Sequence, residues 1–312
     1  MTLSSIFFSD GNSLNLLLTT TLVRTTGSHM EQLDVLKKSI RNSLGSENPA
    51  YLQLRRGYWQ VRNQALLLRK LWMRRNFDPS RIFLNLGGGL FMQPNWRVLD
   101  YCSEYYPLRS SLLDYNVNLE IEEKLPFDSN SVEVIYSSHC LEHLQRSITP
   151  RLFREIHRVL RPGGWLRLTV PDSDMAYFAY LRGDYDFFGI EGPSSPPLAQ
   201  AFLGFFSAGP FDKGATEQLN QDIQTLTKTE FLDRYCPATV DRNTIDYSHH
   251  VNWFNAEKVR SLAISAGFED SRIWKSGYKQ SQSPMLRGPG FDENIPHCSL
   301  YMEMEKCGDD SH

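Results

Sequence analysis

The stretch that decides the fold is Ile82–Gly89, with the sequence IFLNLGGG. The apolar residues around Asn85 predict a short buried strand of a parallel sheet. The glycines Gly87, Gly88 and Gly89 predict a tight turn after this strand, because glycine adopts a positive φ and lets a ligand approach the main chain closely. Ligands of open α/β sheets bind beyond the carboxyl ends of the strands. We therefore expect a ligand at this turn.

A second expected strand, Trp96–Asp100 (WRVLD), indicates which ligand binds. It ends in a carboxylate, which can accept hydrogen bonds from both hydroxyls of a ribose. A dinucleotide fingerprint does not fit, since Met92 stands in place of its third glycine and Pro94 leaves little room for a helix. The sequence also lacks a G-x-x-x-x-G-K-S/T phosphate loop. The pattern therefore favours a nucleoside cofactor without phosphates over NAD, which is the cofactor of an alternative oxidoreductase function.

Stretches further along the chain carry a more specific pattern. A polar turn at Lys124–Ser131 (KLPFDSNS) leads into a strand-like run at Val132–Ser137, which Ser138–Leu144 (SHCLEHL) follows. Arg154–Gly164 (REIHRVLRPGG) predicts a helix stopped by Pro-Gly-Gly, and Trp165–Asp172 predicts the next strand. At these residues the sequence resembles the class I S-adenosylmethionine (SAM) dependent methyltransferases, in the broad group often labelled methyltransferase type 11.

The resemblance covers residues 80–172 well and 245–306 loosely. It implies an α/β fold with a Rossmann-like sheet of seven mostly parallel strands, the last one antiparallel, and helices on both faces. It also implies SAM as the cofactor, with the glycine turn under the methionine part, Asp100 at the ribose, and Asn118 and Leu119 at the adenine. The residues expected to bind the cofactor are Asn85, Gly87, Gly88, Gly89, Asp100, Asn118, Leu119, Ser138 and His139.

Two positions depart from the family pattern. The family's glycine loop reads G-x-G-x-G, whereas Phe91 stands at the last position. Asn118 replaces a common acid, although its side chain can still accept a hydrogen bond from the adenine amino group. Asn95–Asp100 (NWRVLD) is similar to a run found in sugar- and lipopolysaccharide-associated methyltransferases.

These similarities favour, by analogy, methyl transfer to a small polar acceptor, above all a hydroxyl of a sugar or glycan precursor. The alternative that Phe91 suggests is a binding or scaffold protein with the SAM fold but without turnover.

Methyl transfer from a sulfonium is an in-line displacement, for which the protein holds donor and acceptor together and can remove a proton. The catalytic candidates are His139, Asp172 and His250, with His249 as a further base beside the last. The run His139–His143 also spells H-x-x-E-H, an inverted zinc-peptidase pattern. That chemistry needs a helical scaffold with a further ligand, whereas this run follows a strand, so we expect no metal site.

Composition and charge are those of an ordinary globular protein. The chain has 312 residues, of which 41% are hydrophobic and 22% charged. A net charge of −3 gives no case for nucleic-acid binding. Five cysteines without C-x-x-C spacing indicate free thiols in a reducing compartment, and no run approaches the roughly 20 apolar residues of a membrane span. We expect a cytoplasmic monomer or homodimer.

The expected organisation places the methyltransferase core in two parts around an insert. The segments are a disordered or non-native stretch at 1–29, a helical extension at 30–79, the core at 80–172 and 251–306, an acceptor-binding insert or lid at 173–250, and a tail at 307–312. Within the extension, the basic and aromatic part at 51–75 either contacts an anionic membrane surface peripherally or packs an apolar face with its arginines in water.

Within the second part of the core, we expect one helix and two strands. The helix spans 255–267, with Asn255 as its N-cap and Gly267 as its stop. The strands are Arg272–Trp274 and Ser299–Glu305, and the latter alternates as an edge or penultimate strand would.

Overall fold

A computed structural model of the chain describes residues 48–49, 51–53, 66–68, 70–71, 78–89, 91, 93–103, 113–190, 198–208 and 213–308. The chain forms two compact units, one of residues 1–76 with 108–112 and one of residues 77–107 with 113–312. In the first unit, residues 51–53, 66–68 and 70–71 are helical. The expected segment 1–29 and most of the expected helix 51–75 lie outside the described residues.

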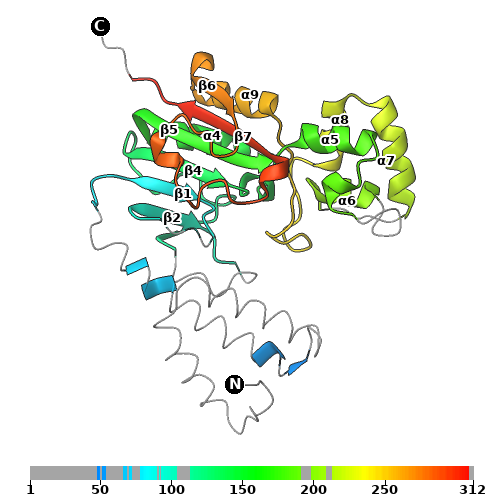
Figure 1. Cartoon of the computed structure of the whole chain (residues 1–312), viewed down its shortest axis with the longest axis horizontal. Coiled ribbons are helices and arrows are strands. Elements are labelled where there is room, and N and C mark those ends of the chain that lie inside the picture. The colour runs from blue at the N-terminus through cyan, green and yellow to red at the C-terminus, as the bar shows by residue number, and fades with distance from the viewer. Residues whose placement is uncertain are drawn as a thin grey trace. The chain divides into compact units, whose positions relative to one another are not determined.

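The second unit is built on a seven-stranded sheet with the order β3-β2-β1-β4-β5-β7-β6 (Figure 1). Its strands are β1 (Phe83–Leu86), β2 (Trp96–Asp100), β3 (Tyr115–Asn116), β4 (Val132–Ser138), β5 (Leu160–Pro171), β6 (Ile273–Ser276) and β7 (Ser299–Glu305). The strands from β3 to β5 pair in parallel, whereas β7 is antiparallel to both β5 and β6. This confirms the expected Rossmann-like methyltransferase sheet, with β7 as its penultimate strand.

Helices and short 3-10 turns connect the strands. The α-helices are α4 (Thr149–Val159), α5 (Ser173–Leu181), α6 (Leu198–Gly204), α7 (Lys213–Thr225), α8 (Lys228–Tyr235) and α9 (Ala256–Ala266). The 3-10 turns are η4 (Leu141–His143), η5 (Asp186–Phe188), η6 (Asp270–Arg272), η7 (Pro284–Leu286) and η8 (Pro296–Cys298).

The two faces of the sheet bury different partners. On one face, Phe153 and Ile156 of α4 and Val259 of α9 pack against the apolar side chains of β1, β4, β5 and β7. On the other face, an aromatic cluster around Phe83 and Trp96 packs against residues of the segment between β6 and β7. Burial on both faces explains why the central strands are almost continuously apolar in sequence.

The ends of two helices test the sequence-based expectations. Asn255 caps α9 by accepting a hydrogen bond from the Lys258 amide at 2.8 Å, and Gly267 ends it with a φ of 110°, as predicted. The helix expected to run up to the Pro-Gly-Gly run instead ends at Val159, and β5 begins at Leu160. The run lies inside the strand because Gly163, with a φ of 72°, donates its amide to the Lys306 carbonyl.

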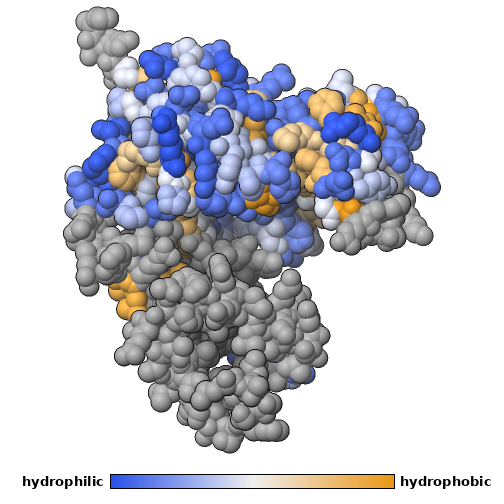
Figure 2. All heavy atoms as spheres, viewed as in Figure 1, coloured by the Kyte–Doolittle hydropathy of each residue, from blue (hydrophilic) through white to orange (hydrophobic). Residues whose placement is uncertain are grey.

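The segment between β5 and α9 folds into helices α5 to α8, which Figure 1 shows gathered beside the sheet where β5 ends. They enclose a second apolar core rich in aromatic rings, including Tyr177, Phe202 and Phe231. Apolar side chains of α5 also reach the surface, among them Phe178 and Leu181, and Figure 2 shows hydrophobic atoms between polar ones in this part of the molecule. No helix in the described ranges has the length and apolarity of a membrane span.

Candidate functional site

The glycine turn after β1 has the backbone that the sequence predicts. Gly87 and Gly89 have φ values of 70° and 52°, in the left-handed region that favours glycine. A Cβ on Gly87 would lie 2.1 Å from the Sγ atom of Cys140, so the turn packs tightly against the residues that follow β4. Burial raises the pKa of the Cys140 thiol well above its usual range, and the nearby carboxylates of Asp100 and Glu142 add to this rise.

Asp100, at the end of β2, is bound to the same turn. Its Oδ2 atom accepts a hydrogen bond from the Gly89 amide at 2.8 Å, and its Oδ1 atom accepts one from the Tyr101 amide at 2.7 Å. Each carboxylate oxygen keeps a second lone pair. The residue expected to hold a ribose therefore also fixes the turn expected to approach the cofactor.

The side chain of Asn85 offers an unpaired hydrogen-bond acceptor beside the glycine turn. Its side chain is buried, and its Oδ1 atom has no hydrogen-bond partner among the described residues. A Cβ on Gly88 would lie 3.1 Å from the Asn85 Cγ atom, which places this amide against the glycine turn. An unpaired buried acceptor is costly unless a ligand or water completes it, so this observation fits a bound molecule with a hydrogen-bond donor.

Phe91, at the position of the glycine loop where a glycine was expected, packs into the aromatic cluster on the sheet. Its ring packs against those of Trp96, Tyr136 and Phe291, with centroid distances of 5.6, 5.7 and 5.4 Å. The side chain in place of the family's third glycine is thus part of the aromatic cluster on the sheet.

The expected adenine residues follow β3. Asn118 is buried, accepts a hydrogen bond at Oδ1 from the Glu120 amide at 2.9 Å, and donates one from Nδ2 to the Tyr247 hydroxyl at 3.0 Å. The ring of Tyr247 stands edge-on to that of Tyr101, with centroids 5.2 Å apart. Sequence reasoning did not single out these two tyrosines, which come from segments far apart in the chain.

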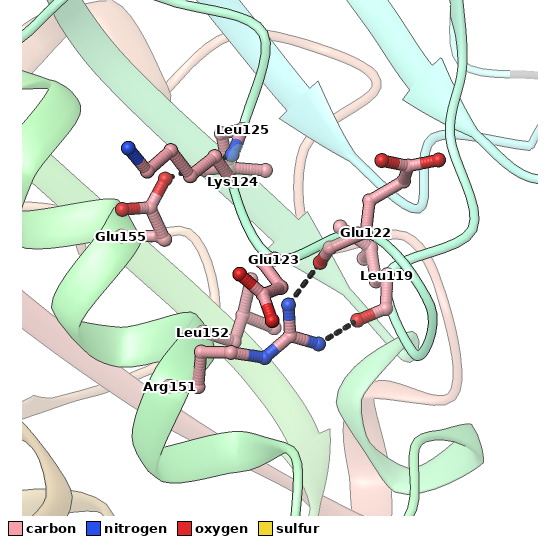
Figure 3. Close-up of a pocket in the computed structure, with 8 residues that line it drawn as sticks. All are labelled: Leu119, Glu122, Glu123, Lys124, Leu125, Arg151, Leu152 and Glu155. Atoms are coloured by element: carbon pink, nitrogen blue, oxygen red, sulfur yellow. Dashed lines mark hydrogen bonds between the residues drawn. The ribbon is translucent and has the colours of Figure 1, made fainter.

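Helix α4 holds the turn after Asn118 in place (Figure 3). Arg151 donates hydrogen bonds to the carbonyl oxygens of Leu119, at 2.8 Å, and Glu122, while Glu155 accepts one from the Leu125 amide. The hollow between these side chains has a volume of about 10 Å³, which admits about one water molecule. The side chains of Arg151 and Glu155 support the turn through these hydrogen bonds, and the hollow is too small for a nucleoside.

A second group of side chains lies at the end of β4, around the carboxylate of Glu142, which is fully buried. His139 has a φ of 48°, and its Nδ1 atom lies 3.1 Å from the Glu142 Oε1 atom. Its Nε2 atom lies 2.7 Å from the Ser299 Oγ atom on β7. Burial alone would raise the pKa of the Glu142 carboxyl, but His139, together with the other two histidines around it, lowers that pKa.

Those other histidines are His143 and His250, whose rings stand edge-on with centroids 4.7 Å apart. The Nε2 atom of His250 lies 4.0 Å from the Glu142 Oε1 atom. Burial lowers the pKa of His143, although Glu142 acts in the opposite direction. The structure therefore brings together two of the three predicted catalytic residues, His139 and His250, and adds Glu142 and His143 to them.

The side chains of the other two candidate bases have their polar partners outside this group. Asp172 is the N-cap of α5, where its Oδ1 atom accepts hydrogen bonds from the amides of Asp174 and Met175. Its Oδ2 atom lies 3.6 Å from the Lys275 Nζ atom. His249 is exposed and contacts Asp246. The catalytic role of Asp172 stays a prediction, and in the structure this residue caps α5. Of the remaining cofactor candidates, Ser138 accepts a hydrogen bond from the Thr169 hydroxyl.

A comparison of the sequence with protein families finds a match in the central part of the sheet. Residues 97–168 match the family model described as a methyltransferase domain. This part of the chain therefore belongs to a methyltransferase domain. The match runs from Arg97 in β2 to Leu168 in β5 and so includes Asp100, Asn118 and His139 of the candidate site.

Solved structures resemble the methyltransferase domain and its surroundings at low identity. Phosphoethanolamine N-methyltransferase 2 of Haemonchus contortus, in complex with phosphomonomethylethanolamine and S-adenosylhomocysteine, is 14% identical over 68% of this chain and 39% of its own, with a TM-score of 0.31. A SAM-dependent methyltransferase from Mesorhizobium loti is 16% identical over 75% of this chain and 96% of its own, with a TM-score of 0.37. These likenesses are too weak to inform the function. No curated protein matches the chain.

Proposed function

We propose that the chain is a SAM-dependent methyltransferase that acts on a hydroxyl of a small polar acceptor, such as a sugar or glycan precursor. The observation that carries this proposal is the clamp between Asp100 and the Gly89 amide at the carboxyl edge of the sheet. It joins the two features that a phosphate-free nucleoside cofactor needs, a turn without side chains and an acceptor for ribose hydroxyls. The sugar-like acceptor rests on analogy with the sequence run Asn95–Asp100.

The residues at this edge would divide the cofactor between them. The glycine turn and the unpaired oxygen of Asn85 would meet the methionine part, and Asp100 the ribose. Asn118 and Leu119 would meet the adenine, with Tyr247 positioned by its hydrogen bond to Asn118. SAM supplies a methyl group on a sulfonium, which is already activated for displacement. What remains for the protein is to hold both reactants in line and to accept a proton.

His139 is the proton acceptor we favour. It follows β4 directly, next to Cys140, which packs on the glycine turn. The Ser299 hydroxyl, 2.7 Å from Nε2, donates its proton to the Ile295 carbonyl oxygen at 2.8 Å. With a proton on Nδ1, facing Glu142, the Nε2 atom of His139 can accept a hydrogen bond from this hydroxyl when the hydroxyl rotates away from Ile295. A proton taken from the acceptor would reach Nε2 through this hydroxyl, and the Glu142 carboxylate would stabilise the imidazolium that forms.

The cofactor assignment is tested by titrating the protein with S-adenosylhomocysteine in a calorimeter, with NAD as the competing candidate. A hydrogen bond to a charged group contributes about 1.5–3 kcal/mol. Asp100→Ala should therefore weaken binding roughly 10- to 150-fold. Asp128→Ala, which removes an exposed acid from a turn, is the matched control and should bind normally. Equal affinity of the Asp100 variant and the wild type would exclude Asp100 from the site.

The proton acceptor is tested by activity. Release of S-adenosylhomocysteine is measured with SAM and a panel of sugars, with amines as the contrasting acceptors. His139→Gln should lower kcat on the best hydroxyl acceptor by about 10²–10⁴-fold, and by far more than it lowers affinity for S-adenosylhomocysteine. A parallel loss in both quantities would assign His139 to cofactor binding alone. Tight cofactor binding without transfer to any acceptor would favour the scaffold alternative.

A further inference from the structure

We propose that Glu142, His143 and His250 form a binding site for a divalent transition-metal ion. One potential ligand atom from each of these side chains lies within 4.8 Å of the other two. Two histidines and one carboxylate are a common ligand set for such ions. This inference goes beyond the methyltransferase function, and it departs from the absence of a metal site expected from the sequence.

The carboxylate of Glu142 is the strongest sign of a missing partner. Its side chain is fully buried, and neither oxygen takes part in a well-formed hydrogen bond among the described residues. The His139 Nδ1 atom lies 3.1 Å from the Oε1 atom, and the Oε2 atom has no ion-pair partner among the residues that the structure describes. A buried carboxylate is costly unless it is paired or coordinates a metal. A cation at this point would complete its interactions.

Both histidines are oriented as metal ligands usually are. The Nδ1 atom of His250 lies 2.8 Å from the Phe205 carbonyl oxygen, and that of His143 lies 3.2 Å from the His249 carbonyl oxygen. A carbonyl only accepts hydrogen bonds, so each Nδ1 must carry a proton and each neutral ring keeps its lone pair on Nε2. Histidines that bind metals commonly donate their other nitrogen to a carbonyl or carboxylate in this way.

The three ligands come from two segments that the backbone fixes to each other. Glu142 and His143 lie in η4, whereas His250 lies where the helical insert returns to the sheet. The Val251 amide donates to the Glu142 carbonyl at 2.8 Å, and the Asn252 side chain donates to the Leu144 carbonyl. These bonds flank the cluster and so hold together the two backbone segments that carry the ligands.

The ligand set also indicates which ion binds. Imidazole nitrogens favour Zn²⁺ and similar ions, whereas Mg²⁺ prefers oxygen ligands. Three protein ligands leave a fourth tetrahedral position for water or for an oxygen of another bound molecule. The arrangement differs from the H-x-x-E-H peptidase pattern, because the His139 Nε2 atom is bound to Ser299 and His250 takes the place of that histidine.

The test is calorimetric titration of the chelator-treated full-length protein with Zn²⁺, and with Mg²⁺ as the contrasting ion. We expect one Zn²⁺ per chain and much weaker binding of Mg²⁺. His250→Ala should weaken Zn²⁺ binding by more than about 10–100-fold, the loss typical of residues that only support ligands. His249→Ala is the matched control, because its exposed side chain contacts Asp246 and only its main chain contacts His143.

Substitution with Co²⁺ gives a second readout, since its visible absorption spectrum reports tetrahedral nitrogen and oxygen ligands. Glu142→Gln, with a thermal unfolding curve to check its fold, should lose this spectrum. If that variant does not fold, the Zn²⁺ titration of His250→Ala still tests the proposal, because His250 is partly exposed and its replacement disturbs the core less. The proposal is overturned if Zn²⁺ does not bind, or if His250→Ala binds it as the wild type and His249→Ala do. Binding of S-adenosylhomocysteine is measured separately, so failure of either proposal can be recognised by itself.

Discussion

At the scale of single residues, Gly87 meets two requirements at once: a positive φ, and no side chain where the turn touches Cys140. Gly163 has nearly the same φ, 72°, but nothing lies within 4 Å of the position of its Cβ. Gly163→Ala should therefore lower the free energy of unfolding only by the cost of a positive φ in alanine, about 1–2 kcal/mol. Gly87→Ala should lower the free energy of unfolding by the same backbone cost and by about 1–3 kcal/mol more, because the new methyl group overpacks against Cys140.

The two free energies of unfolding are compared by urea denaturation of both variants and the wild type. Equal losses would show that the contact with Cys140 relaxes without cost. A larger loss at Gly87 would establish that this glycine serves the packing of the protein as much as the approach of a ligand.

From the sequence, the chemical character of single residues could be predicted better than the residues that they contact. The positive φ of the glycines and the place of Asp100 follow from local pattern, because a run of glycines directly after an apolar strand favours a tight turn with positive φ. The burial of Glu142 and its contacts with His250 do not, since they depend on where the helical insert returns. A pair of histidines in a loop gave no sign that one is exposed and the other faces a buried carboxylate.

At the scale of elements, β5 and β7 are joined to the segment before β7 by buried charges. The Arg167 guanidinium lies 2.6 Å from Asp292 and 3.1 Å from Glu303, and none of the three side chains is exposed. Arg167→Met leaves two buried carboxylates without their cation and should lower the free energy of unfolding by about 3–5 kcal/mol. The matched control is Arg272→Met, which removes an exposed partner of Glu305 and should cost about 0–1 kcal/mol.

Thermal and urea unfolding measure both effects. Similar stability of the two variants would mean that water reaches the Arg167 cluster.

Among the elements themselves, the sequence predicted α9 and β7 closely, because cap residues and alternation are local signals. It placed the start of β5 too late, since Pro-Gly-Gly ordinarily ends a helix and begins a loop, whereas here a neighbouring carbonyl pairs with Gly163.

At the scale of the whole molecule, the second compact unit has apolar cores that lie within residues 83–304. We therefore expect a variant without residues 1–76 to retain the secondary structure of the sheet and to unfold cooperatively. Circular dichroism and a thermal unfolding curve check this. A broad transition without a folded baseline would show that the first unit is required for the stability of the second.

The class of the fold was predictable at this scale because a few motifs mark successive strands of one sheet. The acceptor was not, since the insert proposed to bind it has a core of mixed aromatic and aliphatic side chains and carries no recognisable motif. The expected cytoplasmic location and the oligomeric state stay predictions. The proposed metal site was not predictable either, because His250 comes from the end of the insert whereas Glu142 and His143 follow β4.

The position of β7 between β5 and β6 also bears on how the protein reaches its fold. The outer edge of β5 pairs with a strand that lies beyond residue 298, so this pairing must wait until the chain between them has been brought into place. Such non-local pairing slows folding. Until it forms, β5 presents a bare strand edge that can pair with another chain. Dilute conditions during refolding, and chaperones during synthesis, would therefore matter more for this protein than its final stability suggests.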